Sequence, residues 1–201
     1  MSKQSQSPPN ASGPVRDASF GDRIGVTLAR SASWHFVIVF GVTAAVLLAA
    51  YYFPYPAGTA IRRLLDAYLR AYAWMAGMVL RLFESSLVVV GQDIIGRYSI
   101  RIVKTCDGMD VNILLTSAIL AWPCALRRRI IAVVEGIALL VVANTARICT
   151  LYYVGVYAPS SFEFVHLELW PAAILVIAVA FFLIFLTNTS NRCNGLTANR
   201  L

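Results

Sequence analysis

Four apolar segments of helix length run through the chain and limit what it can fold into. They cover residues 34–53, 109–126, 130–152 and 167–187. A hydrocarbon layer of about 30 Å requires roughly 20 apolar residues of helix to cross it. Charged residues make up only 13% of the 201 residues, against about 25% in an average soluble domain. The sequence therefore predicts an all-α polytopic membrane protein whose surroundings are a lipid bilayer.

The stretch between the first two apolar segments has a different pattern. Residues 57–83 gather their charged side chains in one sector of a helix, which predicts an amphipathic helix at the membrane interface. These side chains are Arg62, Arg63, Asp66, Arg70 and Arg81. Residues 85–104 then alternate like strands around a turn signal at 91–93, which predicts a short β-hairpin or meander. Open strands are not tolerated in hydrocarbon, so this β element is expected outside the bilayer.

Two polar ends flank the apolar part of the chain. Residues 1–32 are rich in Ser, Pro, Gln, Asn and Gly and predict a disordered cytoplasmic tail. Residues 188–201 form a second polar tail, also expected in the cytoplasm. Residues 33–187 are then a single membrane-embedded domain.

The orientation of the spans follows from the triple arginine at 127–129, the densest positive cluster in a short connection. Positive connections stay on the cytoplasmic side of a membrane. Arg147 lies about 27 Å from Arg129 along a helix, close to the thickness of the hydrocarbon layer, so it reaches the outer interface. Residues 106 and 166 are then expected on the same outer side. Four spans with both ends inside result. Residues 57–105 carry seven positive charges on the outer side, and five spans with an external N-terminus are the alternative.

Cys106 stands between a basic strand end and the start of a helix. Asp107 can cap that helix, and Gly108 lets the backbone turn closely. Helix N-termini and nearby cations favour the thiolate form of a cysteine. Cys106 is therefore a candidate nucleophile, whereas Cys124 and Cys149 lie within apolar helices and fit a structural role.

Two further polar residues lie at the outward end of the third apolar segment. Asn144 and Arg147 are one turn apart and share a helix face. Together they can stabilise a thiolate or the oxyanion of a carbonyl under attack. His166 opens the last apolar segment and can act as acid and base, with Glu163 or Glu168 orienting its ring. Taken singly, each of these residues is more typical of a structural role or of an interface anchor, and only their convergence on one membrane face indicates a site.

Several classes of function receive no support from the sequence. The net charge of +7 gathers around the spans, where it fits anionic lipids rather than nucleic acid. The four cysteines form no Cys-x-x-Cys pair, and only two histidines are present. We therefore expect neither a metal, nor a cofactor, nor a disulfide framework.

The ordered set Cys-x-Gly at 106–108, Asn-x-x-Arg at 144–147 and His166 resembles the exosortase/archaeosortase family. The intervening helices and the β-like run before the cysteine agree, and the resemblance covers residues 60–187. The small size is similar to the short exosortase H subtype. Family members often have Ser between Cys and Gly, where this chain has Asp107, whose carboxylate disfavours a neighbouring thiolate.

The resemblance implies a cysteine peptidase or transpeptidase in the inner membrane of a Gram-negative bacterium, with its site facing the periplasm. Its partners would be exported proteins with a C-terminal sorting signal that includes a transmembrane helix, followed by an acceptor nucleophile. By position, Cys106 would be the nucleophile, Arg147 the positive partner and His166 the acid and base. Two alternatives are a quinone-linked thiol–disulfide oxidoreductase and a non-catalytic scaffold of a polysaccharide-export system.

Overall fold

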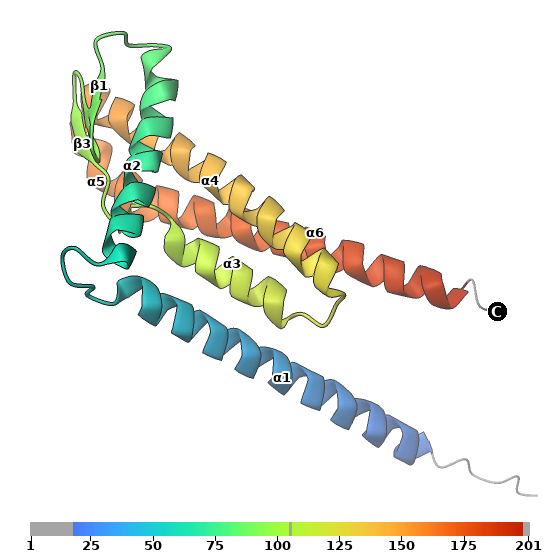
Figure 1. Ribbon diagram of the computed structural model, residues 1–201. Helices are drawn as coiled ribbons and strands as arrows, with labels where there is room; N and C mark the ends of the chain where they lie inside the picture. Colours follow the sequence, from blue (N-terminus) through green and yellow to red (C-terminus); the bar gives the residue numbers. More distant parts are fainter. Residues whose placement is uncertain (1–17, 105, 199–201) are drawn as a thin grey trace, which may run out of the picture. The chain divides into compact units, whose positions relative to one another are not determined.

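The computed structural model describes residues 18–104 and 106–198, with side chains described within 34–104 and 106–189. Residues 1–36 and 37–201 are two separate units. The second unit holds the end of α1 and everything that follows it. The protein is mostly helical, at 75%, with one small sheet (Figure 1).

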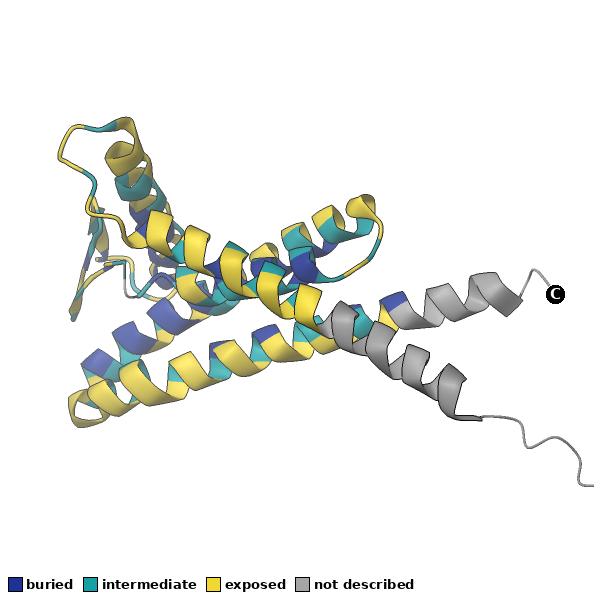
Figure 2. Cartoon of the chain, turned by 90° about the horizontal axis from the view of Figure 1, so that it is seen from below, coloured by how far each residue is buried: buried dark blue, intermediate teal, exposed yellow. Residues whose placement is uncertain are grey.

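Within the described residues, three helices are long and apolar enough to cross a membrane. The long helices are α1 (Ala18–Tyr52), α4 (Leu126–Tyr157) and α6 (Trp170–Ala198). Their span-length parts are Trp34–Tyr52, Leu126–Tyr157 and Pro159–Thr189, and only 11%, 22% and 11% of the most apolar window of each is buried. Exposed residues run along the described parts of all three helices in Figure 2. Apolar surface of this extent is covered by lipid, and the chain is a multi-pass membrane protein.

Helices α1 and α6, the first and last of the chain, are longer than the sequence predicts. Helix α1 begins at Ala18, inside the predicted tail 1–32, and α6 continues to Ala198, past the predicted end at 187. No proline interrupts either extension, so a helix already formed in the apolar part can continue outward one hydrogen bond at a time. Residues 1–17 of the predicted disordered tail and residues 199–201 of the predicted polar tail lie outside the described residues.

Helix α3 (Met109–Ala121) is shorter than the predicted span over 109–126. Its 13 residues extend about 20 Å, less than the hydrocarbon thickness. Pro123 ends it, because the residue before a proline avoids the helical conformation, and Trp122 is extended with ψ 131°. Arg129 then donates to the carbonyls of Cys124 and Leu120, both at 3.0 Å, which satisfies acceptors at the helix end. By length alone three helices span, so the predicted count of four or five stays a prediction.

Helix α2 (Ala60–Arg81) has one buried and one exposed face. Thr59 caps its N-terminus by accepting the backbone N–H of Arg62 at 3.3 Å. The buried residues are Leu69, Tyr72, Ala73, Ala76, Gly77 and Leu80. The arginines that predicted an amphipathic helix are exposed. Its place at the membrane interface stays a prediction.

The β element is a three-stranded antiparallel meander rather than a two-stranded hairpin. Its strands are β1 (Val88–Val90), β2 (Asp93–Ile95) and β3 (Ser99–Arg101), in the order β1-β2-β3. The predicted turn is present, with Gly91 at φ +64°, but Asp93 already belongs to β2. Asp93 faces Arg101 across β2 and β3, and their side chains form a bidentate ion pair of 2.6 and 2.9 Å.

Two apolar clusters hold the second unit together. One joins α2, the sheet and the end of α4 around the fully buried Tyr72, Ile94 and Tyr152. The other joins α3, the first half of α4 and α6 around Ile119 and Leu140. The sheet is thus packed against the end of α4, which is where the candidate site lies.

Candidate active site

A cysteine and a histidine 60 residues apart in sequence lie side by side in the structure. Cys106 Sγ is 3.6 Å from His166 Nε2. Cys106 follows β3 in a tight turn, in which its backbone N–H donates to the carbonyl of Val103 at 2.8 Å. The thiol is half-buried. This is the separation at which an imidazole can accept a thiol proton.

The local helix geometry positions His166. It lies in a π-helical turn, Val165–Leu169, between α5 (Phe162–Phe164) and α6. Pro171 follows two residues after this turn and has no N–H to donate to the carbonyl of Leu167, so the helix widens there. Phe162 stacks on the imidazole with ring centroids 5.7 Å apart and planes 23° apart. This stacking restricts the rotation of the ring that faces Cys106.

The prediction that Glu163 or Glu168 orients the imidazole is wrong for this structure. Both glutamates are exposed, and His166 Nδ1 is buried without a hydrogen-bond partner within 34–104 and 106–189. The ring is held by stacking instead.

Arg147 and Asn144 lie on α4, next to His166 and Gly108 respectively, and only 5% and 1% of their surface is exposed. They share a face of the helix, as their spacing predicts. Arg147 Nη2 donates to the backbone carbonyl of His166 at 3.3 Å, and Arg147 interacts electrostatically with Cys106 and Asp107. The guanidinium therefore connects α4 with the turn that carries the imidazole.

Several buried polar atoms at this point have no partner within the described part of the chain. They are both side-chain polar atoms of Asn144, Nε of Arg147 and Nδ1 of His166. Buried polar groups are almost always hydrogen-bonded, and an unpaired one costs free energy. Two of these atoms, Asn144 Nδ2 and Arg147 Nε, are donors, and unpaired donors near a thiol can bind the oxygen of a carbonyl.

Asp107 and Gly108 form the backbone turn that presents the thiol. Asp107 Oδ1 accepts the N–H of Met109 at 2.9 Å, so its side chain serves the start of α3 as predicted. Its other oxygen accepts the hydroxyl of Tyr51. Burial raises the pKa of Asp107, because desolvation outweighs these two hydrogen bonds. A raised pKa reduces the negative charge next to Cys106, which weakens the predicted effect of Asp107 against the thiolate.

Gly108 is required at its position for two reasons. Its φ is +69°, a left-handed conformation that favours glycine. A Cβ at Gly108 would also lie 3.3 Å from Asn144 Oδ1. The turn after Cys106 therefore lies directly against the amide on α4.

A cavity of about 280 Å³ opens beside the cysteine and histidine. One wall is the continuous run 98–103, which contains β3, and the other wall is formed by Ile148, Leu151 and Phe162. Tyr98, another lining residue, packs on Phe162, with ring centroids 5.8 Å apart, and lies against Gly155. Any peptide that reaches Cys106 through this cavity passes along β3.

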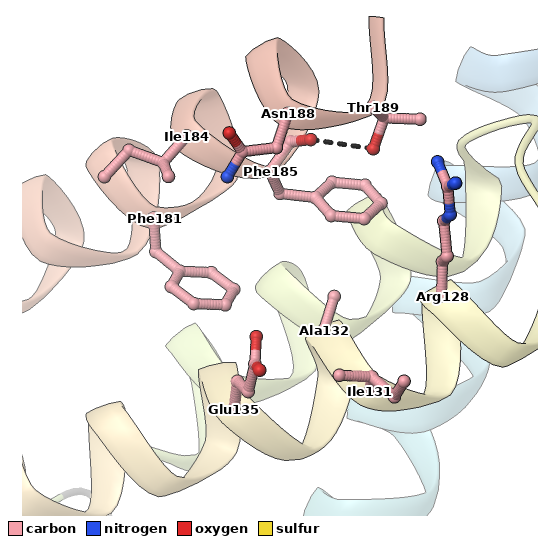
Figure 3. Close-up of a pocket in the computed structure, with 9 residues that line it drawn as sticks. All are labelled: Arg128, Ile131, Ala132, Glu135, Phe181, Ile184, Phe185, Asn188 and Thr189. Atoms are coloured by element: carbon pink, nitrogen blue, oxygen red, sulfur yellow. Dashed lines mark hydrogen bonds between the residues drawn. The ribbon is translucent and has the colours of Figure 1, made fainter. Parts of the chain in front are cut away.

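A second cavity of about 380 Å³ lies between α4 and α6, near the triple arginine (Figure 3). Its lining residues are Arg128, Ile131, Ala132, Glu135, Phe181, Ile184, Phe185, Asn188 and Thr189. Arg128 and Arg147 are 19 positions apart on α4, or about 28 Å along the helix. The cavity contains no cysteine or histidine, so its greater size does not make it the candidate active site.

Sequence reasoning did not identify three residues that support the site. Phe162 lies one turn before His166, and this helical spacing is a signal that could have revealed the stacking. Tyr51 and Tyr98 gave no such signal. They reach Asp107 and Phe162 from 56 and 64 positions away, and only the fold brings them together.

Fold and site together define a multi-pass helical membrane protein with a paired cysteine and histidine beside a buried arginine. The family model described as transmembrane exosortase (Exosortase_EpsH) matches residues 32–186, and the chain belongs to this family. The match includes the first span, which the resemblance over 60–187 had left out. No curated protein and no solved structure was found to match the chain.

Proposed function

We propose that the protein is a membrane-embedded cysteine peptidase or transpeptidase. It acts on C-terminal sorting signals of exported proteins, at the outer face of the inner membrane. The observation that carries this proposal is the 3.6 Å separation of Cys106 Sγ and His166 Nε2, next to the buried and partly unpaired Asn144 and Arg147. Membership of the transmembrane exosortase family supports the same conclusion.

The first half of the reaction forms a thioester. His166 Nε2 accepts the proton of Cys106 Sγ, and the sulfur attacks the carbonyl carbon of the scissile peptide bond. The carbonyl oxygen becomes an oxyanion, which accepts hydrogen bonds from Asn144 Nδ2 and Arg147 Nε, the donors that lack partners. The C–N bond then breaks, and His166 returns the proton to the leaving amine.

The second half of the reaction releases the product. An amine or a water molecule attacks the thioester carbonyl, and His166 accepts its proton. The C–S bond breaks, and the proton returns to Cys106. With an amine the new carboxyl end is transferred, and with water it is hydrolysed.

The spans give the proposed orientation of the site. The triple arginine at 127–129 begins α4, and Arg147 lies towards its other end. If the arginines are cytoplasmic, as positive connections are, then Cys106, Arg147 and His166 lie on the periplasmic side. A substrate anchored by its own transmembrane helix would present the residues just outside the bilayer to the thiol.

The alternatives draw no support from the site. A thiol–disulfide oxidoreductase needs a second thiol beside Cys106, but Cys149 Sγ instead contacts the carbonyl of Ala76 at 3.8 Å within the apolar cluster around Tyr72. A non-catalytic scaffold has no need for buried polar atoms without partners. No observation favours either one.

The test uses membranes of the native host with hydroxylamine as the acceptor nucleophile. Hydroxylamine cleaves a thioester, so the processed proteins acquire a C-terminal hydroxamate that mass spectrometry identifies. We expect hydroxamate products with the wild type and with Cys124→Ala, and none with Cys106→Ala. Hydroxamate formation by the Cys106→Ala variant would contradict the proposal.

A further inference from the structure

The residues of β3 and those on either side of it border the site cavity with both of their alternating sets of side chains. Residues 98–103 line it without a gap. The face of a sheet presents every second residue, because successive side chains point to opposite sides. An uninterrupted run of lining residues is expected only where the backbone edge itself faces the cavity. β3 is the last strand in the order β1-β2-β3, so within the described residues one of its edges has no neighbouring strand.

The register shows which backbone groups face this open edge. The N–H of Ile102 donates to the carbonyl of Gln92 at 3.0 Å, and Ile100 faces Ile94 in the same register. In an antiparallel pair, residues alternate between bonding the partner strand and pointing away from it. The backbone groups of Ile100 and Ile102 therefore point to β2, and those of Ser99 and Arg101 point outward.

Side-chain burial shows which face of β3 packs into the core. Ile94 and Ile102 are 0% and 1% exposed, and Ile100 packs against the same cluster. Ser99 and Arg101 are exposed, and the Arg101 side chain is held aside by its ion pair with Asp93. Within residues 34–104 and 106–189, no side chain is hydrogen-bonded to the outward backbone groups of Ser99 and Arg101.

We propose that the substrate polypeptide binds as an additional β-strand along the open edge of β3. The residues upstream of the scissile bond form this strand, and the backbone groups of Ser99 and Arg101 hold it. This inference rests on the proposed function and specifies how its substrate is recognised. An exposed strand edge is a template for pairing with an extended chain.

The direction of the added strand follows from the path of the chain. The chain runs from Ser99 at the start of β3 through Val103 to Cys106. A peptide whose scissile carbonyl lies at Cys106 then has its nearest upstream residues beside Arg101 and the more distant ones beside Ser99. The bound segment runs parallel to β3. Recognition is mainly through the peptide backbone, with Ile148, Leu151 and Phe162 forming the opposite, apolar wall.

The probe for this proposal is the peptide ketone acetyl-Ala-Ala-Ala-Ala-chloromethyl ketone, used with the full-length protein in detergent micelles. The Cys106 sulfur displaces chloride and forms a thioether, the thiol proton leaving as HCl, and mass spectrometry measures the rate at that residue. Each amide nitrogen of the peptide is methylated in turn, which removes one donor. Because a strand bonds through alternate residues, methylation at every second amide should slow labelling about fivefold, roughly the effect of one hydrogen bond. Methylation at the intervening amides should change the rate less than twofold.

A protein variant provides an independent test. Ser99→Pro removes an N–H that points away from β2, a position at which an edge strand tolerates proline. The measured quantity is the ratio of the labelling rate with the peptide ketone to that with iodoacetamide, which reports the reactivity of Cys106 itself. We expect this ratio to fall at least fivefold.

Three results are informative. A two-residue period in the methylation series, with a lower ratio for Ser99→Pro, supports the added strand. Equal rates for all methylated peptides overturn the added strand while leaving the thiol chemistry intact. If iodoacetamide labels Cys106 but none of the peptide ketones does, the proposed function and the added strand are both contradicted.

Discussion

Gly108→Ala is the substitution that most directly tests the geometry around the thiol. The residue has φ +69°, and a Cβ there would lie 3.3 Å from Asn144 Oδ1. A left-handed backbone costs a residue with a Cβ about 1–2 kcal/mol. A Cβ contact at 3.3 Å also forces Asn144 to move by a few tenths of an ångström. Both effects act at a residue that is one position from Asp107 and two positions from Cys106.

Gly91→Ala is the matched control. Gly91 also has a left-handed φ, +64°, but nothing lies within 4 Å of a Cβ there. It therefore carries the backbone cost without the contact. Both variants should lose about 1–2 kcal/mol in free energy of unfolding, which corresponds to about 2–8 °C in melting temperature for a chain of this size. Only Gly108→Ala should alter the site.

The assay has two readouts on the purified protein in detergent micelles. Thermal unfolding followed by tryptophan fluorescence gives the melting temperature, and labelling of Cys106 by the peptide ketone gives the state of the site. We expect similar melting temperatures for the two variants and a labelling rate at least tenfold lower for Gly108→Ala alone. If the two variants react with the ketone at the same rate, Asn144 does not lie where the structure places it, and the proposed oxyanion site loses its basis.

Three further predictions concern the groups around the thiol. His166→Ala should slow thioester formation about 10²–10⁴-fold, the usual contribution of a general acid and base, as measured by single-turnover hydroxamate release; a rate within threefold of wild type would exclude this histidine as the base. Arg147→Lys keeps a positive charge but loses the planar donor set that bonds the carbonyl of His166. The rate of substrate processing should therefore fall about 10²-fold. An undiminished rate would show that the positive charge alone suffices. Because burial raises the pKa of Asp107 above its ordinary 3.8, the folded protein binds this proton more tightly than the unfolded chain does. Its stabilising effect is present below pH 3.8 and is lost as the pH rises through the raised pKa. The melting temperature of the wild type should fall as the pH rises through this raised pKa and stay flatter for Asp107→Asn. Parallel curves would contradict a raised pKa for this buried carboxyl.

The sequence alone predicted the apolar helices well because lipid imposes a simple rule. A segment that crosses hydrocarbon must be helical and apolar over a fixed length. The segments 34–53, 130–152 and 167–187 met this rule, and the three span-length helices of the structure contain them almost entirely. The predicted span over 109–126 is longer than α3, because Pro123 ends the helix early. The prediction followed the apolar composition of the segment rather than this proline.

The order of the candidate site residues was also visible in the sequence. Cys106 beside a helix start, Asn144 one turn before Arg147, and His166 at the opening of an apolar segment are local patterns. Each depends on positions near one another in the chain. Their grouping in one family signature is what the resemblance added, and the family match over residues 32–186 confirms that membership.

Only the tertiary structure decided how these groups meet. The contact of Cys106 with His166 and the hydrogen bond from Tyr51 to Asp107 each join residues more than 50 positions apart, so they depend on how the helices pack. The sequence predicted a hairpin or a meander over 85–104, and the structure forms the three-stranded meander, with strands of three residues each. Pairing energy in a sheet comes from neighbours on other strands, so a strand this short is specified by its partners and not by its own residues. The open edge of β3 beside the thiol is a product of that same packing.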